Sequence, residues 1–430
     1  MLIRFEAANF RSIAAAVELS MVAIDREREA TRVVPMLGES LLAVAAVYGP
    51  NASGKSNLIA AFHWLREAVQ HSLRIWDDEI AIEPFAFDGN PDAPSEFVVE
   101  STIDGVRFEY VLEVTSERVV YEALFHYPEK KRRRIFEREG QELKLQRGLG
   151  NLSGTRELLT ERALALSIAR RFDEPTVSRF ARDLLRTQVL GHVPRRVRPR
   201  GGVYFAGAPH SGTRATMRWF EERDQPSLFD EREYVPPGLG VDDRERALAL
   251  LRLADLGIDD VVITPQDESP DGRIVQSRVK MIHRAAGKHA ALEFAAESEG
   301  TRTWFQLIGP VLTALSNGSL LLFDELDASL HPTLSAQLIQ LFHDPATNPL
   351  GAQLIFTSHD TSLLNHLNRD EVWLTEKTPD GSTRLGALAD FAGERVRQSQ
   401  NLERAYLHGR FGALPDVDQA ELLRSLGLIG

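Results

Sequence analysis

The sequence predicts an α/β protein built around an open sheet whose strands are covered on both faces, and three observations support this prediction. Residues 41–47 form a continuous apolar run, as a strand buried on both faces requires. The glycine-rich loop Gly49–Ser56 follows at once, and residues 57–73 then place apolar side chains on one helical stripe. Strand, glycine loop and helix in this order are the context of a phosphate-binding P-loop, so we predict a P-loop NTPase.

The P-loop supplies most of the predicted contacts to a nucleotide. Its two glycines let backbone N–H groups converge on a phosphate, and the helix N-terminus adds a partial positive charge there. Lys55 is expected to reach the terminal phosphates, and the Ser56 hydroxyl is expected to ligate Mg²⁺. The sequence therefore predicts binding of a nucleoside triphosphate, with ATP and GTP both left open. The predicted contacts in this segment are Gly49, Pro50, Asn51, Ala52, Ser53, Gly54, Lys55, Ser56 and Asn57.

The composition is typical of a folded globular protein and argues against a membrane, secreted or disulfide-bonded one. The chain has 430 residues, of which 43% are apolar and 26% charged, enough for a large core divided into two or three lobes. No apolar run approaches the roughly 18–20 residues of a membrane helix, and the charges in Met1–Glu6 argue against a secretory signal. Without cysteine there is no disulfide, thiolate nucleophile or cysteine zinc site. We therefore expect a cytoplasmic protein with no membrane partner.

Changes of pattern divide the chain into three expected parts. Residues 1–125 hold the first half of the nucleotide-binding domain and a β-lobe, 126–260 an inserted β-hairpin and helical lobe, and 261–430 the second half. Apolar and polar residues alternate through 85–136, interrupted at Asp104-Gly105, which predicts an antiparallel sheet with a hairpin there. The remaining expectations are two short strands within 2–19, helices within 156–186, 213–223 and 242–256, a break over 191–212, and strands again from Val261.

Two further apolar runs end in polar residues suited to nucleotide chemistry. Residues 319–323 precede Asp324 and Glu325, at the strand end where open α/β sheets bind ligands. Asp324 is expected to support Mg²⁺, and Glu325 is expected to polarise the attacking water. Residues 353–357 are followed shortly by His359, and a histidine there can form a hydrogen bond with the γ-phosphate. The alternatives are an acidic cap of the following helix and a purely structural histidine.

A segment that contains Ser298 and Gly300, before the acidic strand, indicates which class of P-loop NTPase this is. Ser298 is a good N-cap for a helix over 304–315, and the N–H groups at that helix start form an anion site. In this order, with the P-loop, the acidic strand and His359, the set resembles the ABC-type ATPase heads of the SMC and RecF-like proteins. The resemblance assigns Ser298 and Gly300 to the signature that contacts the γ-phosphate held by a second subunit, and Asp327 to the D-loop. It implies a homodimer, or a higher homo-oligomer, with composite ATP sites.

The chain also resembles the prokaryotic standalone AAA/ABC-like ATPases related to the overcoming-lysogenization-defect (OLD) family, which include ATPase components of phage-defence systems such as Septu and PARIS. The resemblance rests on residues 9–12, the P-loop, 297–302, 321–332, 355–360 and the tail 406–415, and is loose over 126–260. It implies an ATP-hydrolysing switch or sensor that controls an effector in bacterial anti-phage defence. Only about 70 residues follow His359, too few for the Toprim nuclease of OLD proteins, so a nuclease or toxin effector would be a separate chain.

Two other functions remain open from the sequence. One is a DNA-repair or chromosome-maintenance head, which would show DNA-stimulated hydrolysis, and the other is a scaffold that binds ATP without turnover. Basic clusters at 130–134 and 195–200 are candidate DNA contacts, although charge runs are usually solvated surface and the net charge of −12 opposes DNA binding overall. Gln188 is the nearest candidate for the glutamine with which ABC heads sense Mg²⁺.

Overall fold

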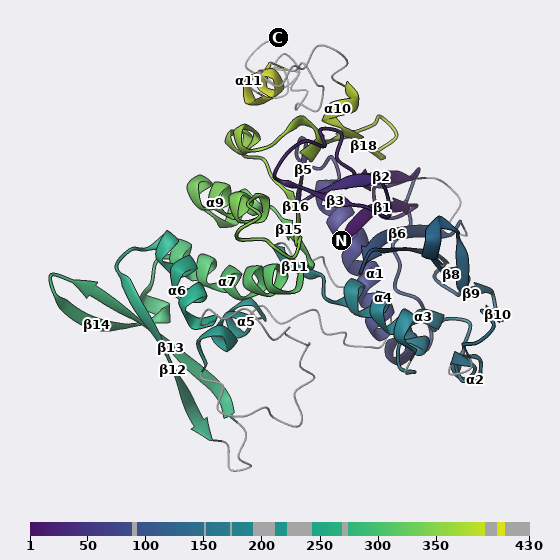
Figure 1. The fold of residues 1–430 in the computed structure, drawn as a ribbon, viewed down its shortest axis with the longest axis horizontal. Helices are drawn as coiled ribbons and strands as arrows, with labels where there is room; N and C mark the ends of the chain where they lie inside the picture. The colour runs from purple at the N-terminus through teal and green to yellow at the C-terminus, as the bar shows by residue number, and fades with distance from the viewer. Residues whose placement is uncertain are drawn as a thin grey trace, which may run out of the picture.

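The computed structural model shows an α/β body from which a small sheet projects (Figure 1). The structure describes residues 1–87, 93–149, 152–172, 174–191, 211–221, 243–268, 274–391 and 402–408. A central sheet lies between a lobe formed by the N-terminal half of the chain and a second lobe that ends in the projecting sheet (Figure 1). Among the described residues, no helix combines the length and apolar character needed to cross a bilayer.

The central sheet is six-stranded, in the order β11-β15-β16-β5-β17-β18. Its members are β5 (Val44–Tyr48), β11 (Gln188–Gly191), β15 (Leu320–Asp324), β16 (Gln353–Thr357), β17 (Val372–Lys377) and β18 (Thr383–Ala387). Every pair is parallel except β17 with β18, which is antiparallel. Strands from three distant parts of the chain therefore end at one edge of the sheet, because parallel strands share a direction.

Both faces of the central sheet are buried, which explains the continuous apolar runs. Along β5, Ala45 and Val47 enter the core cluster that contains helix α1 (Lys55–Ile75). Val44 and Ala46 enter the opposite cluster with α7 (Glu299–Asn317) and α9 (Pro332–His343). The single strand expected over 41–47 is wrong in one respect: Ala43 separates β4 (Glu39–Leu42), which pairs with β3 (Thr31–Val34), from β5. Periodicity cannot show such a break, because the apolar pattern continues through it.

The expected antiparallel sheet is present and has seven strands in the order β10-β9-β8-β7-β6-β1-β2. They are β1 (Leu2–Ala8), β2 (Val17–Ser20), β6 (Ser95–Ile103), β7 (Val106–Val114), β8 (Val119–Tyr127), β9 (Arg133–Glu139) and β10 (Glu142–Leu145). The predicted turn at Asp104-Gly105 joins β6 to β7, and both residues have positive φ, as a tight hairpin requires. The expected lobe boundary after residue 125 falls inside β8, and β9 and β10 continue the same sheet.

Helices cover the lobes close to where the sequence predicts them. The first lobe carries α2 (Thr155–Leu158), α3 (Ala165–Ala169) and α4 (Pro175–Leu185), and the second carries α5 (Ser211–Phe220) and α6 (Asp243–Ala254). The projecting sheet consists of β12 (Ile258–Glu268), β13 (Ile274–Ala285) and β14 (Lys288–Glu293), so the expected boundary after residue 260 lies within a strand. The remaining helices are α8 (Leu326–Ser329), α10 (Leu388–Phe391) and α11 (Leu402–Leu407). The break expected over 191–212 lies mostly outside the described residues.

A buried polar cluster fastens helix α3 to the antiparallel sheet. Glu122 of β8 and Arg138 of β9 have fully buried side chains, 3.7 Å apart. Ala165 and Leu166 lie at the start of α3. Their backbone N–H groups donate hydrogen bonds of 2.6 and 2.8 Å to the Glu122 carboxylate. Arg138 donates to the carbonyl of Ala163 at 2.5 Å. Burial raises the pKa of Glu122, so the ionised cluster depends on these donors remaining in place.

Helices α5 and α7 approach closely at Gly309. A Cβ on this residue would lie 2.3 Å from the backbone nitrogen of Thr216, whose hydroxyl accepts the Gly309 N–H at 2.8 Å. We expect Gly309→Ala to lower the free energy of unfolding by about 1–3 kcal/mol, measured by denaturant titration, because the helices must separate. Gly300→Ala in the same helix is the control, since a Cβ there meets only the Ser298 hydroxyl, at 3.9 Å. Equal stability of the two variants would contradict the close approach.

Candidate nucleotide site

The central sheet brings the predicted site residues together at the carboxyl ends of its strands. The P-loop follows β5, Asp324 ends β15, and His359 comes two residues after β16. Since β15, β16 and β5 are adjacent and parallel, these segments meet at one edge. This is the edge at which open α/β sheets bind ligands.

The P-loop has the backbone conformation of a phosphate cradle. Gly49 and Gly54 have φ values of 155° and 102°, and Ala52 has φ of 62°. Lys55 begins helix α1 and is buried, with its ammonium group donating to the carbonyls of Gly49 and Pro50 at 2.8 and 3.0 Å. The lysine thus folds back over the loop, in a position to exchange these carbonyls for phosphate oxygens.

Hydroxyl groups of three residues from remote segments, Thr375, Thr383 and Ser12, lie beneath the P-loop and form what we call its hydroxyl floor. Thr375 of β17 shares a hydrogen bond of 2.6 Å with Ser53, and Thr383 of β18 donates to the Ser53 carbonyl at 2.9 Å. A Cβ on Gly54 would lie 2.0 Å from the Thr383 hydroxyl, so only glycine permits this approach. Ser12, between β1 and β2, contacts Thr383 at 2.7 Å.

Asn57, which the sequence places among the nucleotide contacts, points its amide toward this floor. Its Nδ2 donates to the Ser12 hydroxyl at 2.6 Å. The amide therefore links helix α1 to the loop between β1 and β2, which is the Asn9–Ser12 segment singled out in the sequence.

Thr357 holds Asp324, the last residue of β15, and the following Glu325 in place. Its buried hydroxyl donates to Oδ1 of Asp324 at 2.7 Å and accepts the backbone N–H of Glu325 at 2.7 Å. Glu325 has left-handed φ and ψ of 56° and 57°, which turns the chain sharply at the strand end. No described residue forms a hydrogen bond with the other Asp324 oxygen. That oxygen, together with the Ser56 hydroxyl, has the hard-oxygen chemistry that Mg²⁺ requires.

Asp327 lies beside His359. Its Oδ1 accepts the backbone N–H of His359 at 3.1 Å. The His359 residue itself is exposed, so its ring is open to a ligand at the sheet edge. The carboxylates of Asp327, Asp324 and Glu325 all favour the charged form of Lys55, which places them around the P-loop lysine.

Ser298 and Gly300 lie apart from this edge, at the start of α7. The Ser298 hydroxyl accepts the Thr301 N–H at 3.1 Å, so the predicted N-cap is confirmed. Both Ser298 and Gly300 are exposed. Helix α7 extends from the central sheet toward the projecting sheet (Figure 1), and its first turn is on the side of β13. Among the described residues, Ser298 forms no hydrogen bond with the P-loop.

Burial lowers the pKa of Lys55 to about 8, against the opposing influence of Asp327, Asp324 and Glu325. The free lysine therefore loses its charge as pH rises through about 8, whereas a bound phosphate favours the protonated form. We expect ATP affinity to fall about tenfold between pH 7 and pH 9, with proton uptake on binding. Calorimetry in two buffers of different ionisation enthalpy measures both quantities. The Lys55→Arg variant should lose the pH dependence; a flat profile in the unsubstituted protein would contradict the lowered pKa.

The roles of the residues that support the site from other segments could not be predicted from the sequence. Thr375 and Thr383 are ordinary strand residues, whereas Thr357 and Ser12 lie in segments that carry the resemblance but had no role assigned to them. Only the convergence of the four on the P-loop and Asp324 shows what they support. Gly191 is a further case, because it pairs with Asp324, and a Cβ there would lie 1.9 Å from the Asp324 carbonyl oxygen.

Gln188 does not occupy the position considered for it. It pairs with Leu321, three residues before Asp324 and thus about 10 Å from the carboxyl edge of the sheet. Its side chain donates to the carbonyl of Arg186 at 3.1 Å.

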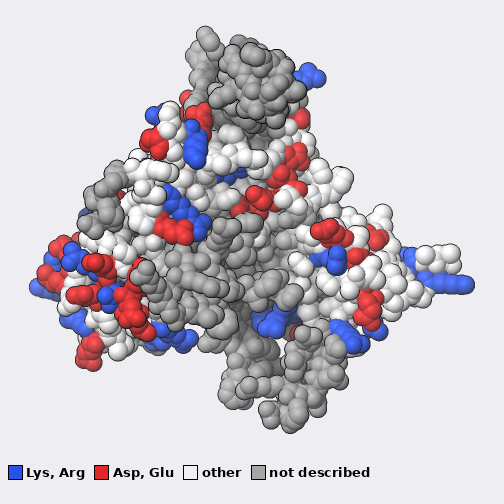
Figure 2. All heavy atoms as spheres, turned by 180° about the vertical axis from the view of Figure 1, so that it is seen from behind, with Lys and Arg blue, Asp and Glu red and all other residues white. Residues whose placement is uncertain are grey.

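The first basic cluster is largely neutralised. It spans the turn between β8 and β9 and the first residues of β9, and each of its three arginines has an acidic partner. Arg132 pairs with Glu109 at 3.0 Å and also covers the Phe125 ring, with its guanidinium 3.6 Å from the ring centroid. Figure 2 shows acidic and basic side chains mixed over this lobe, at the left of that view. The second cluster, at 195–200, lies outside the described residues.

The fold and the site define a P-loop NTPase with an ABC-type ATPase head, an antiparallel β-lobe and a helical lobe. Comparison with protein families gives a match to the family described as "AAA domain, putative AbiEii toxin, Type IV TA system", over residues 44–181 and 193–365. The match covers well over half of the chain, so the protein belongs to this family. No curated protein sequence matches the chain.

Similar solved structures include two SMC heads. The "SMC head domain from Thermotoga maritima" is 13% identical with a TM-score of 0.42, covering 90% of this chain and 98% of that one. The "SmcHead bound to the C-winged helix domain of ScpA" is 14% identical with a TM-score of 0.45, covering 91% and 99%. The family match, not these distant likenesses, carries the assignment.

Proposed function

We propose that the protein binds and hydrolyses ATP, dimerises around it, and acts as a nucleotide-dependent switch. The observation that carries this proposal is the convergence of the P-loop, Asp324-Glu325 and His359 at one sheet edge. Thr357 forms a hydrogen bond with each of the two acidic residues. Hydrolysis needs a phosphate cradle, a metal site and a group that orients water, and this edge offers all three.

Each residue has a distinct role in the proposed reaction. Lys55 and the P-loop N–H groups bind the phosphates, and Ser56 and Asp324 would hold Mg²⁺, which neutralises charge developing on the phosphates. Glu325 orients and polarises the attacking water, since no described residue pairs with its carboxylate. His359 donates to the γ-phosphate and senses its presence.

The second half of the site comes from another copy of the chain in this proposal. Ser298 and Gly300 are exposed at a helix N-terminus that carries a partial positive charge, and they lie on a different lobe from the P-loop. A head-to-tail dimer would place this terminus against the γ-phosphate of the partner. ATP would then join the two subunits, and its hydrolysis would release them.

Mixing two inactive variants tests this arrangement. Lys55→Ala should lose phosphate binding, and Ser298→Arg should block the signature surface without disturbing the fold, because Ser298 is exposed. A mixed dimer contains one intact site, made of Lys55 from one subunit and Ser298 from the other. We expect recovery of up to about a quarter of the normal rate after equal mixing. The absence of any recovery would overturn the action of Ser298 in trans and leave the binding role of Lys55 standing.

We further propose that the switch controls a separate effector, a nuclease or toxin, in bacterial anti-phage defence. The family description, which names a toxin and a type IV toxin–antitoxin system, supports this direction. Protection of cells against phage by the operon, lost in the Lys55→Ala strain, is the test. DNA-stimulated hydrolysis would instead favour a repair or chromosome-maintenance head, and the absence of turnover would favour an ATP-bound scaffold.

A further inference from the structure

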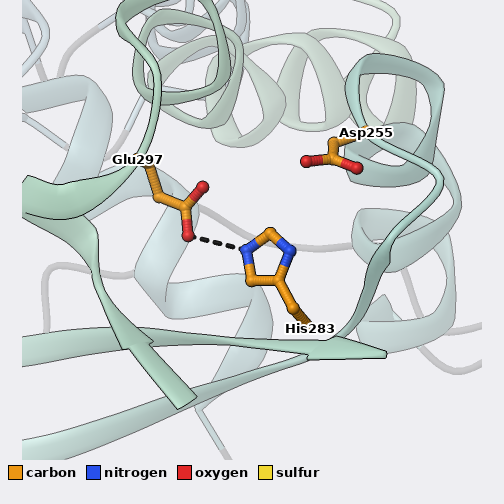
Figure 3. Close-up of side chains that lie close together, drawn as sticks. All are labelled: Asp255, His283 and Glu297. Carbon is orange, nitrogen blue, oxygen red and sulfur yellow. Dashed lines mark hydrogen bonds and ion pairs between the residues drawn. The ribbon is translucent and has the colours of Figure 1, made fainter. Parts of the chain in front are cut away.

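Three potential metal ligands converge in the second lobe, outside the nucleotide site. Asp255 follows helix α6, His283 lies on β13, and Glu297 directly precedes Ser298. One ligand atom from each lies within 4.8 Å of the other two. Figure 3 shows the imidazole between the two carboxylates, with its Nε2 2.8 Å from Oε1 of Glu297.

The backbone holds the three residues together. Ile258, at the start of β12, pairs with His283, and the Arg284 N–H donates to the Gly257 carbonyl at 2.8 Å, which fastens the Asp255 turn to β13. On the other side, β14 pairs with β13 up to Glu293, and a short 3₁₀ turn, Phe294–Ala296, leads from there to Glu297. The cluster therefore exists before any ligand binds, which lowers the entropic cost of binding.

The two carboxylates give the cluster an excess of negative charge, which favours a bound cation. Glu297 and His283 have side chains only 5% and 19% exposed, so two carboxylates face one imidazole in a sparsely hydrated place. Among the described residues, no lysine or arginine forms an ion pair with Asp255 or Glu297. A positively charged His283 would offset only one of the two carboxylates, through its contact with Glu297. A divalent cation would balance both, and an uncompensated carboxylate in a partly buried site is costly.

The ligand chemistry indicates which cation. Imidazole favours zinc and related transition metals over magnesium or calcium, and three protein ligands leave a position for water. We propose that Asp255, His283 and Glu297 bind a zinc-class divalent ion that clamps the projecting sheet to the start of helix α7. Ligand atoms on tetrahedral zinc lie roughly 3.3–3.5 Å apart, so Asp255, which is half-buried and directly follows α6, moves inward on binding.

Zinc binding to nucleotide-free protein, in excess Mg²⁺, tests the site without involving the ATP site. We expect one zinc ion per chain whose affinity, measured by competition with a chromogenic chelator, falls roughly tenfold or more in His283→Ala and in Asp255→Asn. His289→Ala is the matched control, because His289 lies on the same sheet and contacts Asp259 at 3.0 Å. It should bind zinc normally.

A second measurement guards against loss of folding in His283→Ala. Asp255→Asn keeps the shape of the side chain. At the same zinc concentration, zinc should raise the melting temperature of the unsubstituted protein and of His289→Ala clearly more than that of Asp255→Asn. Co²⁺ should give visible d–d absorption that both ligand variants lose. Unchanged zinc affinity in the two ligand variants, or no zinc binding by the unsubstituted protein, would overturn the proposal.

Discussion

Glu325→Gln should reduce ATP hydrolysis by roughly 10²–10⁴-fold while leaving ATP binding intact. The substitution keeps the size of the side chain and removes the charge that would polarise water. The backbone N–H of residue 325 still donates to Thr357, so the sharp turn after β15 is preserved. Because ATP then persists in the site, the variant should accumulate as an ATP-dependent dimer, measured by light scattering after gel filtration.

Glu142→Gln is the control for this variant, since Glu142 is exposed on β10 in the antiparallel lobe. It should hydrolyse ATP at the normal rate. Normal turnover by Glu325→Gln would remove Glu325 from its assigned role. Turnover lost without a dimer would retain the role and contradict the proposed association through ATP.

Thr357→Val should lower both hydrolysis and stability, although Thr357 is not expected to touch the nucleotide. Valine has the same shape but leaves the Asp324 carboxylate without its donor and the Glu325 N–H without its acceptor. Each buried group left unpaired costs about 1–3 kcal/mol. Hydrolysis should fall about 10²-fold, as expected for a displacement of about 1 Å at a reacting centre.

Thr357→Ser provides the matched control, because serine retains the hydroxyl and loses only a methyl group. It should restore most of the rate and most of the free energy of unfolding. ATP affinity should change little in either variant, since the P-loop contacts Thr375 and Thr383 rather than Thr357. If valine and serine behave alike, the hydroxyl does not position Asp324 and Glu325.

Much of the central sheet could be predicted because burial on both faces leaves a strong local pattern. The runs that end at Val47 and Phe323 are continuously apolar because alternate residues enter two different cores, and the three central residues of β16, 354–356, follow the same pattern. The P-loop was equally clear, since glycines at fixed spacing between a strand and a helix have few other causes. The limit of this reasoning is Ala43, where a bend leaves the apolar pattern unchanged.

The supporting polar residues could not be predicted in the same way. Glu122 and Arg138 are charged residues in alternating strands, where solvent exposure is the ordinary expectation, yet both are fully buried. Their burial depends on backbone N–H and carbonyl groups from the α3 region, which is distant in sequence. The cluster of Asp255, His283 and Glu297 could not be predicted either, because the spacing of these residues in the chain matches no metal-binding motif.

The local motifs of this protein can be recognised from its sequence alone: a P-loop, an acidic strand end and a following histidine, in an order that resembles the ABC-type ATPase heads. Each of these motifs consists of a few consecutive residues, so it can be identified without knowing the fold. How these motifs are held in place depends on contacts made by the folded chain: those of Thr357, the hydroxyl groups beneath the P-loop and the close approach of Gly191 to Asp324. The physical reason is that such contacts join residues far apart in the chain, where side-chain shape and hydrogen-bond direction, rather than composition or periodicity, determine which groups meet.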